Sequence, residues 1–110
     1  MAIINTGTGT LGALDEVVQW NGDDADGTFV TVTGTWAGTI TFQVSVNGTD
    51  WVAFNYIPLA AGGSLASTLT ANSAGVRLSL ANVPYARVRM TAYTSGTANI
   101  QFANYRFSTR

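Results

Sequence analysis

The stretch from Gly34 to Trp51 reads GTWAGTITFQVSVNGTDW, and it decides the expected fold. Between Gly38 and Asn47 the side chains alternate strictly between two faces. The apolar face carries Ile40, Phe42, Val44 and Val46, and the polar face carries Thr39, Thr41, Gln43 and Ser45. A period of two is typical of a strand with one buried face. Asn47-Gly48 then supplies the dipeptide most typical of a tight hairpin turn, so the stretch predicts a β-hairpin.

The face of Trp36, at the start of this stretch, depends on whether the strand is regular. Trp36 is in even step with Ile40 and Phe42, which places it in the core. A bulge at Ala37-Gly38 would instead turn it outward.

The face of Trp51, at the other end, depends on the length of the hairpin loop. A two- or four-residue loop would place Trp51 and Ala53 on the inner face, whereas a three-residue loop with a bulge would place Val52, Phe54 and Tyr56 there. The second arrangement buries more carbon. We therefore favour it and expect Trp51 on the opposite face.

Further alternating runs, separated by turn residues, continue along the chain. They fall at Asp15–Trp20, Thr28–Gly34, Leu65–Thr70, Val76–Leu80, Tyr85–Tyr93 and Ala98–Phe102. Thr94-Ser95-Gly96-Thr97 is expected to turn the chain, and residues 57–64 form the longest expected loop because Pro58 interrupts a strand. No segment has a helical period. We expect an all-β chain that forms a single antiparallel β-sandwich of about eight strands, with jelly-roll connections as one form of it.

Residues 1–14, MAIINTGTGTLGAL, are expected to form an extended, flexible N-terminal arm ahead of a sandwich domain at residues 15–110. The arm contains Ile3, Ile4 and Leu11, which we expect to add to a neighbouring sheet or to lie on a partner. Gly7-x-Gly9-x-x-Gly12 formally matches a dinucleotide fingerprint. That motif works only between a strand and a helix, and no helix is expected here, so we assign it no function.

The composition excludes much catalytic chemistry. The chain has no cysteine and no histidine, which removes the usual zinc ligands, Cys–His and Ser–His–Asp catalysis and thiol redox chemistry. Lysine is also absent. We therefore expect a protein that is not an enzyme and that carries no cofactor.

An acidic turn carries Asp23, Asp24 and Asp26. Three carboxylates in four residues form a weak candidate site for calcium. A full EF-hand loop needs alternate oxygen ligands and a later Glu, and Ala25 and Phe29 interrupt that pattern. A solvated acidic turn is the favoured interpretation.

Charge is scarce and unevenly distributed. Only 10% of residues are charged and the net charge is −1, which argues against nucleic acid or an anionic membrane as the main partner. All six acidic residues lie between Asp15 and Asp50, and all five arginines lie between Arg77 and Arg110. The two groups either pair inside the domain or make head-to-tail contacts between subunits. The start of the chain does not resemble a signal peptide, and no transmembrane segment is expected.

Arginine and tyrosine alternate along one face of the strand at Tyr85–Tyr93. Arg87 and Arg89 lie between the two tyrosines, and such a stripe can recognise a carboxylate or an aromatic partner. Aromatic residues in an all-β domain are more typical of a core or a subunit interface than of a sugar platform. The expected interface residues are Ile3, Ile4, Leu11, Trp36, Trp51, Tyr85, Arg87, Arg89 and Tyr93.

The opening stretch also resembles a pattern that recurs in small structural proteins of tailed bacteriophages. The pattern is Gly-Thr-aromatic-x-Gly-Thr-hydrophobic, then Gln-x-Ser, then Asp/Asn-Gly, then Trp, and Gly34–Trp51 follows it in order. Tyr85–Arg89 and Thr91–Thr97 resemble the second half of the same family, an Arg-Val-Arg strand that ends in a Ser-Gly-Thr turn. Asn47 stands where Asp is common, which the turn tolerates.

This resemblance implies a β-sandwich of the virion: a capsid decoration (cement) protein, a head fibre base or a tail-associated domain. We favour capsid decoration, in which a homotrimer binds the major capsid protein and stabilises the phage head. The protein would be assembled in the host cytoplasm and reside in the virion. The alternative is a carbohydrate-binding module of a tail or head fibre that uses Trp51 and the Tyr85/Tyr93 stripe.

Overall fold

The computed structural model describes residues 2–22, 25–59, 65–80 and 83–107. Over these ranges the chain forms one antiparallel sheet of eight strands and no helix. The strands are β1 (Ala2–Leu11), β2 (Val17–Asn21), β3 (Gly27–Ser45), β4 (Val52–Ala53), β5 (Ile57–Pro58), β6 (Thr68–Leu69), β7 (Ser73–Leu78) and β8 (Tyr85–Arg106). The all-β expectation is confirmed. Within the described ranges there is accordingly no helix with the length and apolar character needed to cross a membrane.

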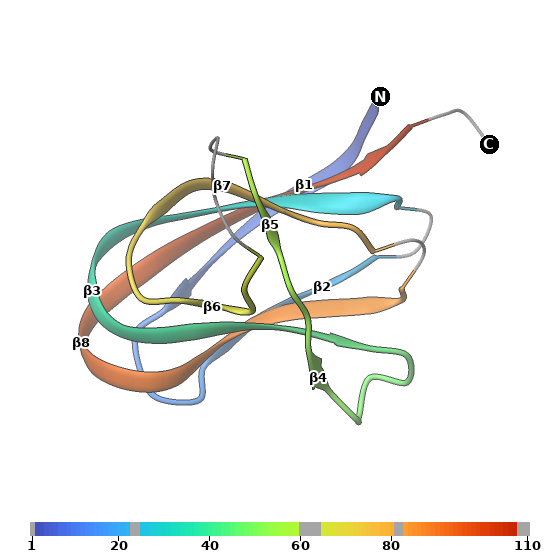
Figure 1. Cartoon of the computed structure of the whole chain (residues 1–110). Coiled ribbons are helices and arrows are strands. Elements are labelled where there is room, and N and C mark those ends of the chain that lie inside the picture. The colour runs from blue at the N-terminus through green and yellow to red at the C-terminus, as the bar shows by residue number, and fades with distance from the viewer. Residues whose placement is uncertain (1, 23–24, 60–64, 81–82, 108–110) are drawn as a thin grey trace.

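Two long strands organise the sheet. β8 pairs with β3 along the whole length of β3, from Gly27 opposite Tyr105 to Ser45 opposite Tyr85. Both strands bend sharply near their middle, so the sheet folds onto itself and remains open at its edges (Figure 1). The expected β-sandwich is therefore confirmed as one folded sheet.

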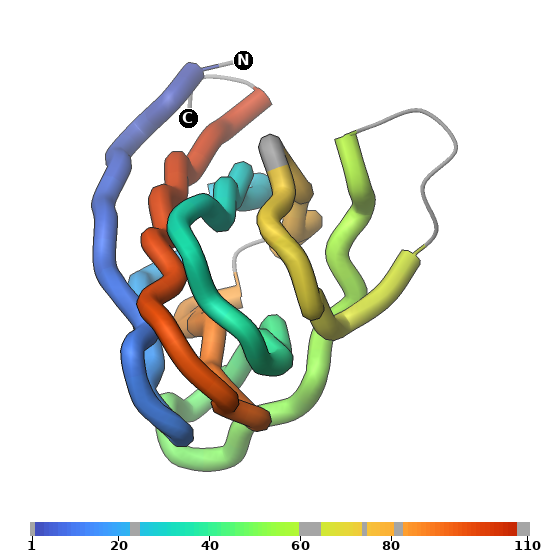
Figure 2. The backbone as a smooth tube through the Cα atoms, turned by 90° about the vertical axis from the view of Figure 1, so that its left-hand side faces the viewer, coloured from blue at the N-terminus to red at the C-terminus, as the bar shows by residue number. Residues whose placement is uncertain are grey.

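Each half of the β3–β8 pair contributes to one layer. Layer A contains β1, the second half of β8, the first half of β3, β7 and β5. Layer B contains β2, the first half of β8, the second half of β3, β4 and β6. Figure 2 shows the tube at right angles to Figure 1, with β1 along one margin of the molecule.

The core lies between the two layers. It is formed by Leu11, Val18, Trp20, Val30, Val32, Ile40, Phe42, Val44, Tyr56, Val76, Leu78, Leu80, Ala86, Val88, Met90, Ala98 and Ile100. The alternation predicted for the strand is confirmed at Ile40, Phe42 and Val44. Val46 was expected on the same face but is 78% exposed, because β3 ends at Ser45 and the period of two ends with it.

The expected turn at residues 94–97 does not reverse the chain. β8 continues through it, and Gly96, with φ of 82°, lies where the strand bends from layer B to layer A. On β3 the bend carries Gly34, with φ of 101°, and register shifts at Ala37/Gly38 and Thr39/Ile40. The glycines that suggested a turn serve a bend in two paired strands.

The hairpin after β3 has a longer loop than a two-residue turn. The last ladder pair joins Val44 to Val52, so the chain between them forms the loop. Tyr56 is buried and packs against Phe42 with ring centroids 5.0 Å apart, and Phe54 packs on the core. Val52 was expected inside with them but is 61% exposed. Phe54 and Tyr56 thus face inward as expected, whereas Val52, next to the loop, does not.

The N-terminal segment pairs with its own sheet. We expected residues 1–14 to be a flexible arm, whereas β1 pairs with Ala98–Arg106 of β8. Leu11 is fully buried in the core, so it is not exposed for contact with a partner. The paired strand has alternating glycines because the core side chains beneath it fill the space that a Cβ would need.

The proline of the expected long loop lies at the sheet edge. β5 pairs with Val76 and Arg77 of β7, and Pro58 occupies the outermost strand of layer A. An edge strand tolerates proline because its outer side needs no ladder donor. Residues 60–64 of that loop lie outside the described residues.

Candidate interaction surface

The outer face of layer B carries a positioned arginine. Arg87 alternates with the buried Ala86 and Val88, so its side chain lies on the outer face. Its Nε donates a hydrogen bond to Oε1 of Gln43 at 2.7 Å, and its Cζ lies 4.1 Å from the centroid of the Trp51 ring. This stacking confirms that Trp51 lies opposite the core face. A guanidinium held by a ring and an amide is pre-organised for a partner's carboxylate or carbonyl.

Two positive charges share this face. Arg89 is two residues along β8, and its Nη2 lies 2.6 Å from Oδ1 of Asp15. Burial, followed by the charge of Arg89, lowers the pKa of Arg87 from its ordinary value. For Arg89 and Asp15, the expected pairing of acidic and basic residues inside the domain is confirmed.

Hydrogen bonds within the loop fix the position of Trp51. Oδ1 of Asn47 accepts hydrogen bonds from the backbone N–H groups of Thr49 and Asp50, each at 2.8 Å. Oγ of Ser45 accepts one from Gly48 at 2.9 Å. Such Asx contacts are typical of Asn in tight turns. Tyr85 lies beside Gly48, so Trp51, Tyr85 and Arg87 come together at one end of layer B.

The remaining expected interface residues lie elsewhere. Ile3 is 50% exposed on β1, and the neighbouring Ile4 is half-buried. Trp36 packs partly on the core, while its Nε1 donates to Oδ1 of Asn72 at 2.6 Å. Tyr93 is 37% exposed near the bend, and its hydroxyl donates to the carbonyl of Gly96 at 3.0 Å. Of the expected interface residues, the structure therefore brings together only Trp51, Tyr85, Arg87 and Arg89.

The acidic turn is only partly described. Asp23 and Asp24 lie outside the described residues, and Oδ2 of Asp26 accepts a hydrogen bond from the backbone N–H of Phe107 at 2.6 Å. Among the described residues, no group of three or more Asp and Glu side chains is arranged to hold a metal ion. The calcium site at this turn stays a prediction.

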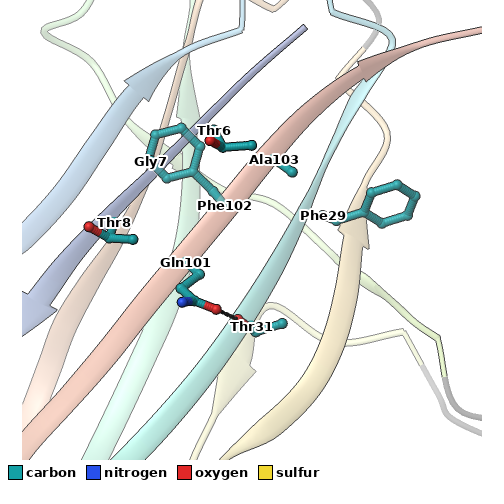
Figure 3. Close-up of a pocket in the computed structure, with 8 residues that line it drawn as sticks. All are labelled: Thr6, Gly7, Thr8, Phe29, Thr31, Gln101, Phe102 and Ala103. Atoms are coloured by element: carbon teal, nitrogen blue, oxygen red, sulfur yellow. Dashed lines mark hydrogen bonds between the residues drawn. The ribbon is translucent and has the colours of Figure 1, made fainter. Parts of the chain in front are cut away.

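A groove on the outer face of layer A was not expected from the sequence. Its volume is about 390 Å³, and Figure 3 shows its lining, which comes from three neighbouring strands. The lining residues are Thr6, Gly7, Thr8, Phe29, Thr31, Gln101, Phe102 and Ala103. None of them is ionisable. Only the sheet order shows that β1, β8 and β3 are neighbours, so no local pattern in the sequence indicates this groove.

An aromatic cluster continues the same face beyond the groove. Tyr105 stacks on Phe29 with centroids 4.7 Å apart and meets the edge of Phe107 at 5.2 Å. Tyr105 is 1% exposed, and this burial raises the pKa of its hydroxyl. Arg77 hydrogen bonds to Tyr105 and opposes that rise. Layer A thus presents a neutral groove beside a packed aromatic cluster.

The comparisons with known proteins give a structural likeness. No family model matches the chain, and no curated protein matches it. The fold is similar to the crystal structure of the SPBc2 prophage-derived protein YomS, with a TM-score of 0.68 and 10% sequence identity. The match covers 94% of this chain and 98% of YomS. At this identity the likeness shows a shared fold over nearly the whole of both chains.

Proposed function

We propose that this chain is a structural protein of a bacteriophage particle and that its role is capsid decoration. The observation that carries the proposal is the fold shared with a prophage-derived protein over 94% of the chain. The resemblance of Gly34–Trp51 to a pattern of phage structural proteins supports the same function. In this proposal the protein resides in the virion, has no catalytic role, and binds the major capsid protein and further copies of itself, with a trimer favoured by the resemblance.

The outer face of layer B is the proposed contact with the capsid. Tryptophan, tyrosine and arginine are the residues that most often dominate binding energy at protein interfaces. Trp51, Tyr85 and Arg87 gather there, and the loop contacts hold Trp51 in place before binding. Pre-organised side chains lose little conformational freedom on association.

Binding to phage heads tests this proposal. Heads purified without the protein are incubated with the intact chain, Trp51→Ala, Arg87→Ala or the control Thr33→Ala, and bound protein is measured after sedimentation. Thr33 is exposed on layer A. We expect the two layer B variants to bind about tenfold or more weakly and the control to bind normally. Failure of the intact chain to bind heads would overturn the proposal.

The groove on layer A favours carbohydrate binding as a second candidate function. Its lining combines hydroxyl and amide groups with the ring of Phe29 and carries no charge, which suits a neutral saccharide. The ring of Trp51, by contrast, is stacked by Arg87. A glycan array tests this function: binding lost in Gln101→Ala and kept in Trp51→Ala would support it, and an array without hits would remove it.

A further inference from the structure

The outer edge of β1 differs from the other edges of the sheet. β1 is the first strand in the sheet order, and within the described residues it pairs only with β8. In an antiparallel sheet, alternate backbone N–H and C=O groups of such a strand point away from its neighbour. Along Asn5–Leu11 the register with β8 is uninterrupted, since the bulge lies between Ile3 and Asn5. Figure 2 shows β1 at the margin of the molecule.

Along Asn5–Leu11 this edge lacks the usual protection against pairing. Natural edge strands are short or carry proline, charge or bulges. At the opposite edge β5 has two residues and contains Pro58, and β4 and β6 also have two residues each. β1 has ten residues and contains neither proline nor any charged residue. β2, which among the described strands also pairs only with β8 and also lacks proline and charge, has five residues. The longer β1 is therefore the edge that another strand can join most readily.

The sequence of this edge is symmetric. Thr6-Gly7-Thr8-Gly9-Thr10 reads the same in both directions. An antiparallel pair of two such strands centred on Thr8 would place threonine opposite threonine and glycine opposite glycine. Thr6, Thr8 and Thr10 are exposed, and opposed threonines on one face of a sheet stabilise a strand pair. The partner that matches this edge best is a second copy of the same strand.

We propose that two copies of this chain pair through β1 across a two-fold axis at Thr8, joining their layer A sheets into one continuous sheet. Asn5–Leu11 of one copy runs antiparallel to the same segment of the other. Because the segment is uncharged, the two copies meet without charge repulsion. The contact does not depend on capsid binding. Because it is two-fold, it joins copies in pairs, either as a dimer or as a link between two larger assemblies.

A cysteine cross-link tests the two-fold position. The chain has no cysteine, so Thr8→Cys introduces a single thiol that would lie directly opposite its copy, at a spacing that a cross-strand disulfide can bridge. The control Thr33→Cys places a thiol on the same face of layer A, on β3, which β8 separates from β1. Under mild oxidation we expect a covalent dimer from Thr8→Cys and monomer from the control. Equal cross-linking of the two variants would overturn the proposal.

The register gives a second, independent test. Thr6 of one copy would lie opposite Thr10 of the other, so neither Thr6→Cys nor Thr10→Cys should cross-link efficiently alone. Their mixture should give a mixed disulfide, which mass spectrometry identifies. A mixture that cross-links no more than the separate variants would contradict the two-fold register.

A charge at the axis tests the contact without cross-linking. Thr8→Lys would place two like charges opposite each other, and we expect self-association measured by sedimentation to weaken about tenfold. Thr33→Lys, with the same charge off the edge, should leave it unchanged. Equal weakening by both variants would show that β1 is not the contact.

Discussion

At the scale of single residues, the glycines of β1 are explained by the side chains packed beneath them. A Cβ at Gly9 would lie 2.7 and 2.9 Å from the two γ-carbons of Val18, and one at Gly7 would overlap the ring of Phe102. Phe102 in turn stacks on Trp20, with centroids 4.7 Å apart. The strand can lie close to these residues only without side chains at Gly7 and Gly9. What resembles a flexible Thr/Gly segment is therefore a strand in close contact with the core.

Gly9→Ala should destabilise the protein. Val18 is buried and β-branched, so it has little freedom to move away from the added methyl group. We expect the free energy of unfolding to fall by about 1–3 kcal/mol, the usual cost of overpacking. Urea denaturation measures the loss, with Thr10→Ala as the exposed control on the same strand. Equal stability of the two variants would contradict the close packing.

A hydrogen-bond network around the buried Thr28 and Asn104 connects β1, β2, β3 and β8. Nε1 of Trp20 donates to Oγ1 of Thr28 at 3.2 Å, and Thr28 donates to Oδ1 of Asn104. Nδ2 of Asn104 donates to Oδ1 of Asn5 at 2.7 Å and to the carbonyl of Asn21 at 3.0 Å. Thr28 and Asn104 are buried, so these groups depend on one another rather than on solvent.

Thr28→Val should therefore cost more than its small change in shape suggests. It leaves the indole N–H and the amide oxygen without a partner, at about 1–3 kcal/mol for each unsatisfied group. Thr28→Ser keeps the hydroxyl and should retain more stability. Thermal unfolding of both variants checks this, and a Val variant as stable as the Ser variant would show that the network contributes nothing.

At the scale of the elements, the bend of β3 and β8 determines the sandwich. The two strands remain paired through the bend because glycines with positive φ adjust both backbones. A Cβ at Gly96 would overlap the carbonyl oxygen of Thr35 on the paired strand. Space, as well as conformation, thus requires glycine at this position.

Gly96→Ala should be more damaging than Gly48→Ala. Both glycines have positive φ, at 82° and 78°, so both variants incur the cost of an L-residue in the left-handed region, about 1–2 kcal/mol. At Gly48 an added Cβ would lie 3.5 Å from the ring of Tyr85, an ordinary contact. Only Gly96→Ala adds a backbone clash. Chemical denaturation of the pair measures the difference, and equal losses would argue against a close approach at the bend.

At the scale of the whole molecule, buried tyrosines link stability to alkaline pH. Burial raises the pKa of Tyr56 and of Tyr105 above the ordinary value of 10.0. In the unfolded chain these hydroxyls lose their protons first, so the unfolded state binds fewer protons in this range. The contribution of these two tyrosines to stability should be constant below about pH 10 and fall as pH rises through the folded pKa values.

Unfolding followed from pH 8 to pH 11 checks this prediction. Tyr56→Phe and Tyr105→Phe each remove one of the titrating groups, so each variant should lose less stability over this range than the intact chain. The chain has no histidine, so no imidazole titration overlaps the measurement. A pH profile unchanged in both variants would contradict the assignment.

Much of the fold could be predicted from the sequence because it depends on local alternation. Ile40, Phe42 and Val44 face the core as their period requires, and the polar stripe with Arg87 and Arg89 faces outward. Part of the candidate interaction surface on layer B could be predicted in the same way, because Tyr85 and Arg87 lie on one face of a single strand. That Trp51 stacks on Arg87 depends on the loop length, which local alternation does not specify.

The sequence by itself determined an all-β chain, the buried face of its central strand and the absence of histidine and cysteine chemistry, because these follow from local periodicity and composition. Only the tertiary structure decided that β1 joins the sheet, that the glycines at Gly34 and Gly96 bend rather than reverse the chain, and that three strands form a neutral groove. These features arise from contacts between residues far apart in the chain. The same glycine can serve a turn, a bend or a close approach, and only its distant neighbours distinguish these roles.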